Sequence, residues 1–214
     1  DSSPGVDFEE QVVNNVVEFG GAVSKGSKPV IYARGNHETR GEYAGEILDA
    51  LGLNEFYYTA DVGGVSFVVL DSGEDKVDTH PEYGGMTEYK KYRENMIDWL
   101  KTVKVKNEKV VAVCHSWAIS DIEKDLSLAG WNELYRLGAG LIMSGHLHQC
   151  RFIGQGDEAE KEMTSLYPDI TGYIAGGDMN GEYVASVVTF GEKEIIIKAI
   201  DNSGKTVFNE SVEW

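Results

Sequence analysis

The sequence has few cysteines, few positive charges and no long apolar run. Its two cysteines, Cys114 and Cys150, are too few for a disulfide framework. We expect two free thiols, with a single bridge between them as the alternative. No stretch approaches the ~20 apolar residues that span a bilayer, so we expect no transmembrane helix.

Basic residues are strongly outnumbered by acidic ones. The chain has 19 Lys and Arg against 36 Asp and Glu, which gives a net charge of −17. A surface of this sign repels polyanions, so we expect no binding to a nucleic-acid backbone. A small phosphorylated substrate or a phosphoprotein stays compatible with this charge, because bound cations reverse the local field.

Hydrophobic periodicity alternates between helix and strand over the first two thirds of the chain. It predicts helices over about 7–23, 39–51, 87–103 and 130–137, and strands over 29–33, 55–60, 65–71, 109–114 and 141–143. Gly52 is placed to end the second helix, and residues 72–86 are expected to form a surface loop. The last third predicts short strands near 150–153, 172–175, 183–190, 194–200 and 205–212.

This order of elements predicts an α/β fold. We expect two packed mixed β-sheets flanked by helices, as a four-layer α/β/β/α sandwich. At 214 residues, the chain is expected to form a single domain over residues 1–214.

Four of the five histidines lie where a predicted strand ends. His37 is in the turn Gly-Asn-His-Glu at residues 35–38, His115 follows strand 109–114, and His146 and His148 are in Gly-His-Leu-His at residues 145–148. A sheet edge holds side chains rigidly while a loop opens them to a substrate. Zinc, iron and manganese accept imidazole together with amide or carboxylate oxygen. The pattern therefore predicts a metal site.

Each motif has a simpler interpretation when it is taken alone. The turn at residues 35–38 is typical of a capped loop with a surface histidine, and His115 alone is typical of a hydrogen-bonded histidine at a sheet rim. The order, spacing and strand-end placement of the motifs agree with one another, and this agreement favours the metal site.

In this order, the motifs resemble the third, fourth and fifth motifs of the calcineurin-like metallophosphoesterase superfamily. The segment Phe-Val-Val-Leu-Asp-Ser at residues 67–72 is similar to the strand that follows the third motif in acid-phosphatase-like members. The resemblance covers most of the chain. It implies hydrolysis of phosphate mono- or diesters by a two-metal hydroxide mechanism, with two ions of manganese, iron or zinc in the intact protein.

The resemblance also implies roles for individual residues. Asn36, His115 and His146 would bind one metal ion, and His148 would bind the other. His37 would be catalytic, by steadying the transition state or protonating the leaving oxygen. Independently of the resemblance, Arg40 is a catalytic candidate because its fork of donors could reach a phosphate oxygen; the alternative is a solvated arginine.

The sequence departs from the family at its beginning. The family's first two motifs, Asp-X-His and Gly-Asp-X-X-Asp, precede the Asn-His-Glu turn and supply the bridging carboxylate, but neither occurs before residue 35. We interpret Asp-Thr-His at residues 78–80 and Gly-Asp at residues 177–178 as chance matches, because they follow that turn. We therefore expect an N-terminally truncated domain that lacks its first strands and is impaired as a catalyst. Its uncovered sheet edge would favour a homodimer.

Two alternatives compete with the phosphoesterase. The chain could be a catalytically incomplete family member that acts as a metal-binding or structural module. It could also be an unrelated α/β domain, in which case the four strand-end histidines would not cluster in space.

Overall fold

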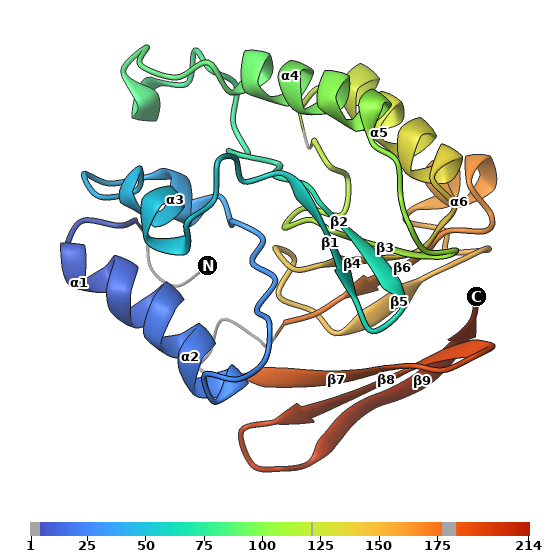
Figure 1. Cartoon of the computed structure of the whole chain (residues 1–214). Helices are drawn as coiled ribbons and strands as arrows, with labels where there is room; N and C mark the ends of the chain where they lie inside the picture. The colour runs from blue at the N-terminus through green and yellow to red at the C-terminus, as the bar shows by residue number, and fades with distance from the viewer. Residues whose placement is uncertain (1–4, 121, 177–182) are drawn as a thin grey trace.

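A six-stranded mixed sheet forms the centre of the protein (Figure 1). The computed structural model describes residues 5–120, 122–176 and 183–214. The strand order is β1-β2-β3-β4-β6-β5. The inner pairs are parallel and the two outer pairs are antiparallel. The bounds are β1 (Tyr58–Val62), β2 (Val65–Val69), β3 (Lys109–Val113), β4 (Ala139–Ser144), β5 (Arg151–Ile153) and β6 (Thr171–Ile174).

A three-stranded antiparallel sheet packs on one face of the large sheet. It consists of β7 (Val184–Phe190), β8 (Glu194–Asp201) and β9 (Thr206–Glu213), in that order. Strand β8 alternates, with Ile195, Ile197 and Ala199 buried between exposed residues, as expected for a strand with one covered face. Ile195 and Ile197 join Val111 and Leu141 of the large sheet in one apolar cluster between the sheets.

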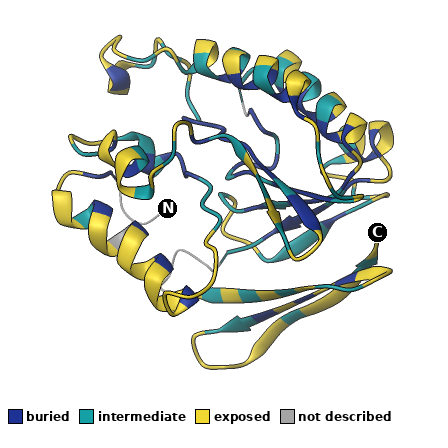
Figure 2. Ribbon diagram, in the orientation of Figure 1, coloured by how far each residue is buried: buried dark blue, intermediate teal, exposed yellow. Residues whose placement is uncertain are grey.

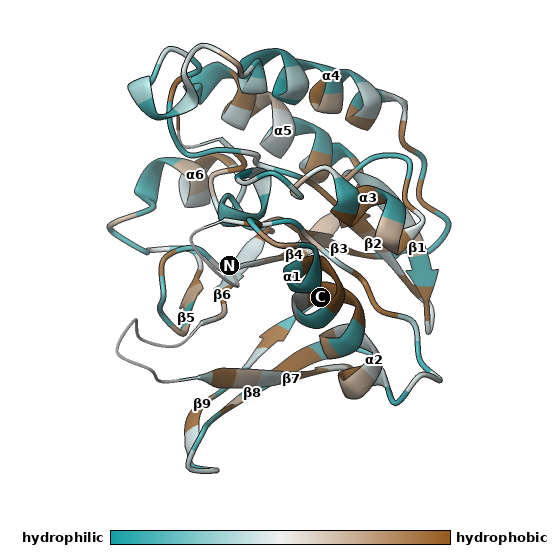
Figure 3. Cartoon of the chain, turned by 90° about the vertical axis from the view of Figure 1, so that its left-hand side faces the viewer, coloured by the Kyte–Doolittle hydropathy of each residue, from teal (hydrophilic) through white to brown (hydrophobic). Residues whose placement is uncertain are grey.

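Helices cover the other face of the large sheet. They are α4 (Tyr89–Thr102), α5 (Lys124–Arg136) and α6 (Lys161–Leu166). In Figure 2 buried and exposed stretches alternate along α4 and α5, and Figure 3 shows the matching mixture of apolar and polar residues. Met96 and Leu100 of α4 and Trp131 and Leu134 of α5 are buried in the cluster that also contains Ala112 of β3. This amphipathic packing makes the helical layer part of the main core.

The N-terminal helices pack into a separate, smaller apolar cluster. Residues 9–24 form α1 (Glu9–Val12), a π-helical stretch (Val13–Glu18) and α2 (Phe19–Ser24), and α3 (Glu46–Leu51) lies beside them. Val12 and Val16 contact this cluster together with Ile47 and Phe56. The N-terminal region around the turn at residues 35–38 therefore has an apolar core of its own.

The predicted fold class is confirmed, with differences in individual elements. The smaller sheet is antiparallel throughout rather than mixed. The helix predicted over 39–51 is wrong in length, because only Glu46–Leu51 is α-helical; Gly52 ends it with φ 63°, as predicted. Helix α5 begins six residues before the predicted start at residue 130, at Lys124, and α6 was not predicted.

The predicted strand at residues 29–33 is wrong. This segment pairs with no strand among the described residues, and Val30 is 53% exposed. The backbone N–H and C=O of Tyr32 instead both bond to the hydroxyl of Tyr58, at 2.9 Å each. Sequence pattern identifies residues that favour an extended backbone, but a strand also needs a neighbour to complete its hydrogen bonds.

Two further expectations concern disulfide bonds and transmembrane helices. Among the described residues neither Cys114 nor Cys150 forms a disulfide, and Cys114 is buried. Across the described ranges, none of the helices has the length and apolar character needed to cross a bilayer.

Gly172 in β6 provides a test of the packing between α5 and the sheet. A Cβ atom built on Gly172 would overlap the indole ring of Trp117, which is itself buried against Trp131. We predict that Gly172→Ala lowers the free energy of unfolding by about 1–3 kcal/mol or more, because the ring has no free space to enter. Urea unfolding measures the effect. Gly154→Ala is the control, since nothing lies within 4 Å of its Cβ position, and equal stability of the two variants would contradict this packing.

Candidate metal centre

Strands β3 and β4 bring two of the candidate histidines to the same sheet edge. The strands are parallel, with Ala112 opposite Ile142 and Val113 opposite Met143. Beyond the strand ends the backbones stay linked, because Cys114 N–H donates to the carbonyl of Met143 and Gly145 N–H donates to that of His115, both at 3.0 Å. His115 and His146 therefore leave the sheet side by side.

Three candidate side chains converge at this edge. Asn36 Oδ1 lies 3.0 Å from His115 Nε2, and His146 Nδ1 lies 3.2 Å from the same nitrogen. Donor atoms that share a zinc ion at roughly 2.0–2.1 Å each are about 3 Å apart, so these atoms fit the coordination of one cation. Of the four strand-end histidines that were expected to cluster, the structure thus brings His115 and His146 into contact.

Local hydrogen bonds shape the turn that carries Asn36. His37–Thr39 forms a short 3-10 helix, in which Thr39 N–H donates to the carbonyl of Asn36 at 3.3 Å. The buried carboxylate of Glu38 accepts from Gly35 N–H at 3.1 Å. These hydrogen bonds satisfy polar groups of the turn locally. Asn36 itself is only 3% exposed.

The second histidine turn has an unusual backbone. His146 and His148 both have positive φ, 65° and 49°. Residues other than glycine adopt this backbone conformation at a cost in free energy. His148 is exposed, and among the described residues no hydrogen bond or ring contact joins it to Asn36, His115 or His146. The structure therefore brings together the three residues predicted for one metal ion, and His148, the residue predicted for the other, makes no such contact with them.

The available ligands suit one cation. In the part of the chain that the structure describes, no group of three or more His, Cys, Asp or Glu side chains could hold a metal ion. The convergent set consists of two imidazoles and an amide, and a three-ligand site can hold zinc with an open position. The Gly-Asp pair at residues 177–178 lies outside the described residues.

The guanidinium of Arg40 is bonded to carboxylates and is not free to contact a ligand at this site. Its Nε and Nη2 atoms donate to the two carboxylate oxygens of Glu74 at 2.5 and 2.8 Å, and Nη2 also reaches Asp75 at 3.3 Å. A bidentate fork already bonded to a carboxylate is not available to a phosphate. The structure therefore gives Arg40 a different role from the predicted phosphate contact.

The Asp-Thr-His sequence at residues 78–80 has a local structural role. The Asp78 carboxylate accepts from the backbone N–H of Tyr89 and Lys90, at the start of α4, at 2.8 and 3.2 Å. His80 Nδ1 accepts from Glu82 N–H at 3.3 Å. Both contacts agree with the interpretation of this sequence as a chance match.

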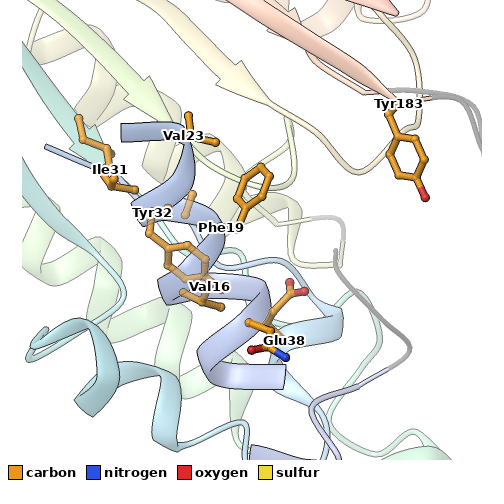
Figure 4. Close-up of a pocket in the computed structure, with 11 residues that line it drawn as sticks. Val16, Phe19, Val23, Ile31, Tyr32, Glu38 and Tyr183 are labelled. Carbon is orange, nitrogen blue, oxygen red and sulfur yellow. The ribbon is translucent and has the colours of Figure 1, made fainter. Parts of the chain in front are cut away.

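A cavity of about 540 Å³ lies near the candidate site but has a different character (Figure 4). Most of its lining is apolar and comes from the helix at residues 9–24 and from residues 30–33; Glu38 and Tyr183 also line it. None of the three convergent side chains lines it. Since the described residues of its lining include no cationic side chain, it is not suited to a phosphate group.

A set of buried charges lies around the turn at residues 35–38 and was not predicted from the sequence. Arg34, Asp71, Glu74 and Arg93 are each less than 10% exposed. The predicted surface loop over residues 72–86 is therefore wrong at its beginning, where Ser72 and Glu74 are buried. Buried charges require partners, and partners distant in the chain leave no local pattern in a sequence.

Comparison with known proteins agrees with these motifs. The family model for calcineurin-like phosphoesterases matches residues 2–150, which is more than half of the chain. The chain belongs to the calcineurin-like phosphoesterase family. A search of curated proteins found no match.

Two solved structures are similar to this family member at low sequence identity. One is GAP50, described as the anchor in the inner membrane complex of Plasmodium, with 13% identity and a TM-score of 0.49 over 81% of this chain. This chain covers 62% of the GAP50 chain, which is less than two thirds of its length. The other is a conserved uncharacterised protein from Streptococcus pneumoniae, described as a predicted phosphoesterase, with 10% identity and a TM-score of 0.40. The match covers 98% of this chain and 93% of that one.

Glu74 provides a test of the charges around the turn. Burial raises the pKa of this carboxyl, but hydrogen bonds from Arg40, Thr39 and Tyr83 outweigh burial and lower the pKa well below its ordinary value of 4.5. Because the pKa is lower in the folded than in the unfolded state, the ionised carboxyl stabilises the folded state at pH values above the unfolded pKa. This contribution is lost as the pH falls below about 4.5. We predict that the free energy of unfolding decreases as the pH falls below that value, and that Glu74→Gln has a shallower slope. Urea unfolding at several pH values measures both slopes, and identical slopes would exclude Glu74 as a contributor.

The backbone at His148 gives a second prediction, which compares two variants that both lack the imidazole. A non-glycine residue with positive φ costs roughly 1 kcal/mol more than glycine. His148→Gly should therefore be more stable than His148→Ala by about 1 kcal/mol. Thermal unfolding of the two variants decides this, and an equal or lower stability of the glycine variant would show that His148 has another backbone conformation.

Proposed function

We propose that this protein is a metal-dependent phosphohydrolase that acts on phosphate mono- or diesters. One observation carries the proposal: Asn36 Oδ1 and His146 Nδ1 both lie within 3.2 Å of His115 Nε2, at distances that suit a shared cation. Membership of the calcineurin-like phosphoesterase family supports the reaction class.

The proposed cation site uses Asn36, His115 and His146. A divalent ion of manganese, iron or zinc held there would supply a nucleophile at neutral pH and neutralise charge on the phosphoryl oxygens. Asn36 is nearly buried and His115 and His146 are half-buried, so the donors would be held in place from the protein side while the edge stays open to a substrate.

Two further histidines complete the proposal. His37, next to Asn36 in the same turn, would steady the transition state or protonate the leaving oxygen. His148 would be the ligand of a second ion, and its exposure to solvent suggests that this ion is bound weakly. Hydrolysis that needs both ions would then be impaired in this chain.

A small phosphorylated substrate suits the charge of the protein. The net charge of −17 opposes a polyanionic substrate, whereas a small ester needs only the local field of the bound cation. The second candidate function is a binding module that holds one ion without turnover. The exposure of His148, which makes no hydrogen bond or ring contact to the other three donors among the described residues, is the observation that favours this alternative.

We predict that His115→Ala abolishes tight Mn²⁺ binding. It should also lower kcat/KM on an aryl phosphate by more than about 100-fold, because a lost metal ligand costs more than the 10–100-fold of an outer contact. His80→Ala is the matched control, since this fifth histidine lies in the loop before α4 and, among the described residues, contacts none of Asn36, His115 and His146. Isothermal titration with Mn²⁺ and hydrolysis of p-nitrophenyl phosphate measure the two effects.

The outcomes of this experiment separate the two candidate functions. Loss of both binding and hydrolysis in His115→Ala but not in His80→Ala supports the phosphohydrolase. Mn²⁺ binding by the unaltered protein without hydrolysis of a mono- or diester supports the binding module. Hydrolysis that survives His115→Ala would refute the proposed site.

A further inference from the structure

Two carboxylates hold the turn that carries Asn36 from both sides. Before the turn, Arg34 Nη2 pairs with Asp71 Oδ2 at 2.6 Å. After the turn, Thr39 Oγ1 donates to Glu74 Oε1 at 2.7 Å, and Arg40 binds both oxygens of Glu74. The candidate metal ligand thus lies between two fixed points that belong to the segment after β2.

The carboxylate before the turn is fully enclosed. Asp71 is 0% exposed, and besides Arg34 it accepts the hydroxyl of Tyr92 at 2.9 Å and the N–H of Gly73 at 2.9 Å. Burial raises the pKa of Tyr92, so this hydroxyl keeps its proton and remains a donor. Asp71 therefore has partners for both of its oxygens and a defined orientation.

The segment that supplies these carboxylates is itself anchored to the helical layer. Arg93 of α4 is 1% exposed, and its Nη1 donates to the carbonyls of Ser72 and Glu74 at 3.1 and 3.2 Å. Its other two nitrogens bind the carboxylate of Glu123 at 2.8 and 3.0 Å. Residues 72 and 74 are thus held by α4 independently of their contacts with the turn.

Stability alone is a poor explanation for this arrangement. Desolvation offsets much of the attraction in a buried ion pair, and an apolar replacement of similar shape is often as stable. A fixed orientation of the turn is a better explanation, because a ligand atom must be held to within about half an ångström. The contacts behind metal ligands provide that constraint. A purely structural role would change global stability; an orienting role would change the turn first.

We propose that Asp71 and Glu74 are positioning residues that hold the turn at residues 34–40 so that Asn36 Oδ1 reaches His115 Nε2. The inference rests on the proposed function for the identity of the ligand, a divalent cation. Neither carboxylate contacts the cation; each acts through the arginine or threonine that flanks the turn.

The test compares Glu74→Gln with a matched variant elsewhere. Glu133 pairs with Arg136 at 2.5 Å on α5, so Glu133→Gln removes a similar charge away from the turn. Thr39→Val is a milder second variant, which removes without a change of charge the hydroxyl that lies 2.7 Å from Glu74 Oε1 and 2.6 Å from the carbonyl of Asn36. Hydrogen exchange of the metal-free proteins reports on residues 34–40, and titration with Co²⁺ reports the affinity and the visible absorption spectrum of the bound ion.

We expect faster exchange confined to residues 34–40 in Glu74→Gln and Thr39→Val, with Co²⁺ binding about 10–100-fold weaker and an altered spectrum. Glu133→Gln should match the unaltered protein in both measurements. Unchanged exchange at residues 34–40 in both variants, or faster exchange in which residues 34–40 change no more than the rest of the chain, would overturn the inference. If the unaltered protein binds no Co²⁺ while exchange still increases locally, the metal-dependent function fails and the positioning role stands.

Discussion

Strands β3 and β4 are parallel and in register, and their carboxyl ends place His115 and His146 at one point of the sheet edge. The packing of side chains on both faces of β3 constrains this register. In β3, Ala112 faces the helices and Val111 faces the smaller sheet, and both faces are buried. A shift by one residue would exchange the two faces, so the packing of the whole sandwich also determines where the histidines leave the sheet.

The third donor depends on a different kind of contact. Asn36 comes from a segment that pairs with no described strand, so the sheet cannot position it. Its position relies on polar contacts to the segment after β2, namely the pairs Arg34–Asp71 and Arg40–Glu74. The candidate site thus combines donors fixed by backbone register with a donor fixed by buried charges.

The difference between these two constraints explains what could be predicted from the sequence. The strands that end at His115 and His146 were predicted because apolar runs and strand-end histidines are local patterns. The convergence of Asn36 with them followed from the order of the motifs and is seen in the structure. The unpaired state of residues 29–33 and the ion pair of Arg40 could not be predicted, because each depends on residues distant in the chain.

The separate apolar cluster around α1 and α3 has a thermodynamic consequence. Because that cluster is separate from the apolar clusters of the sandwich, loss of its packing would leave those clusters in place. Asn36 sits at the junction of the two regions, whereas His115 and His146 belong to the sandwich. An ion bound by all three would therefore cross-link the two regions, and occupancy of the site would be coupled by mass action to the closing of the N-terminal region.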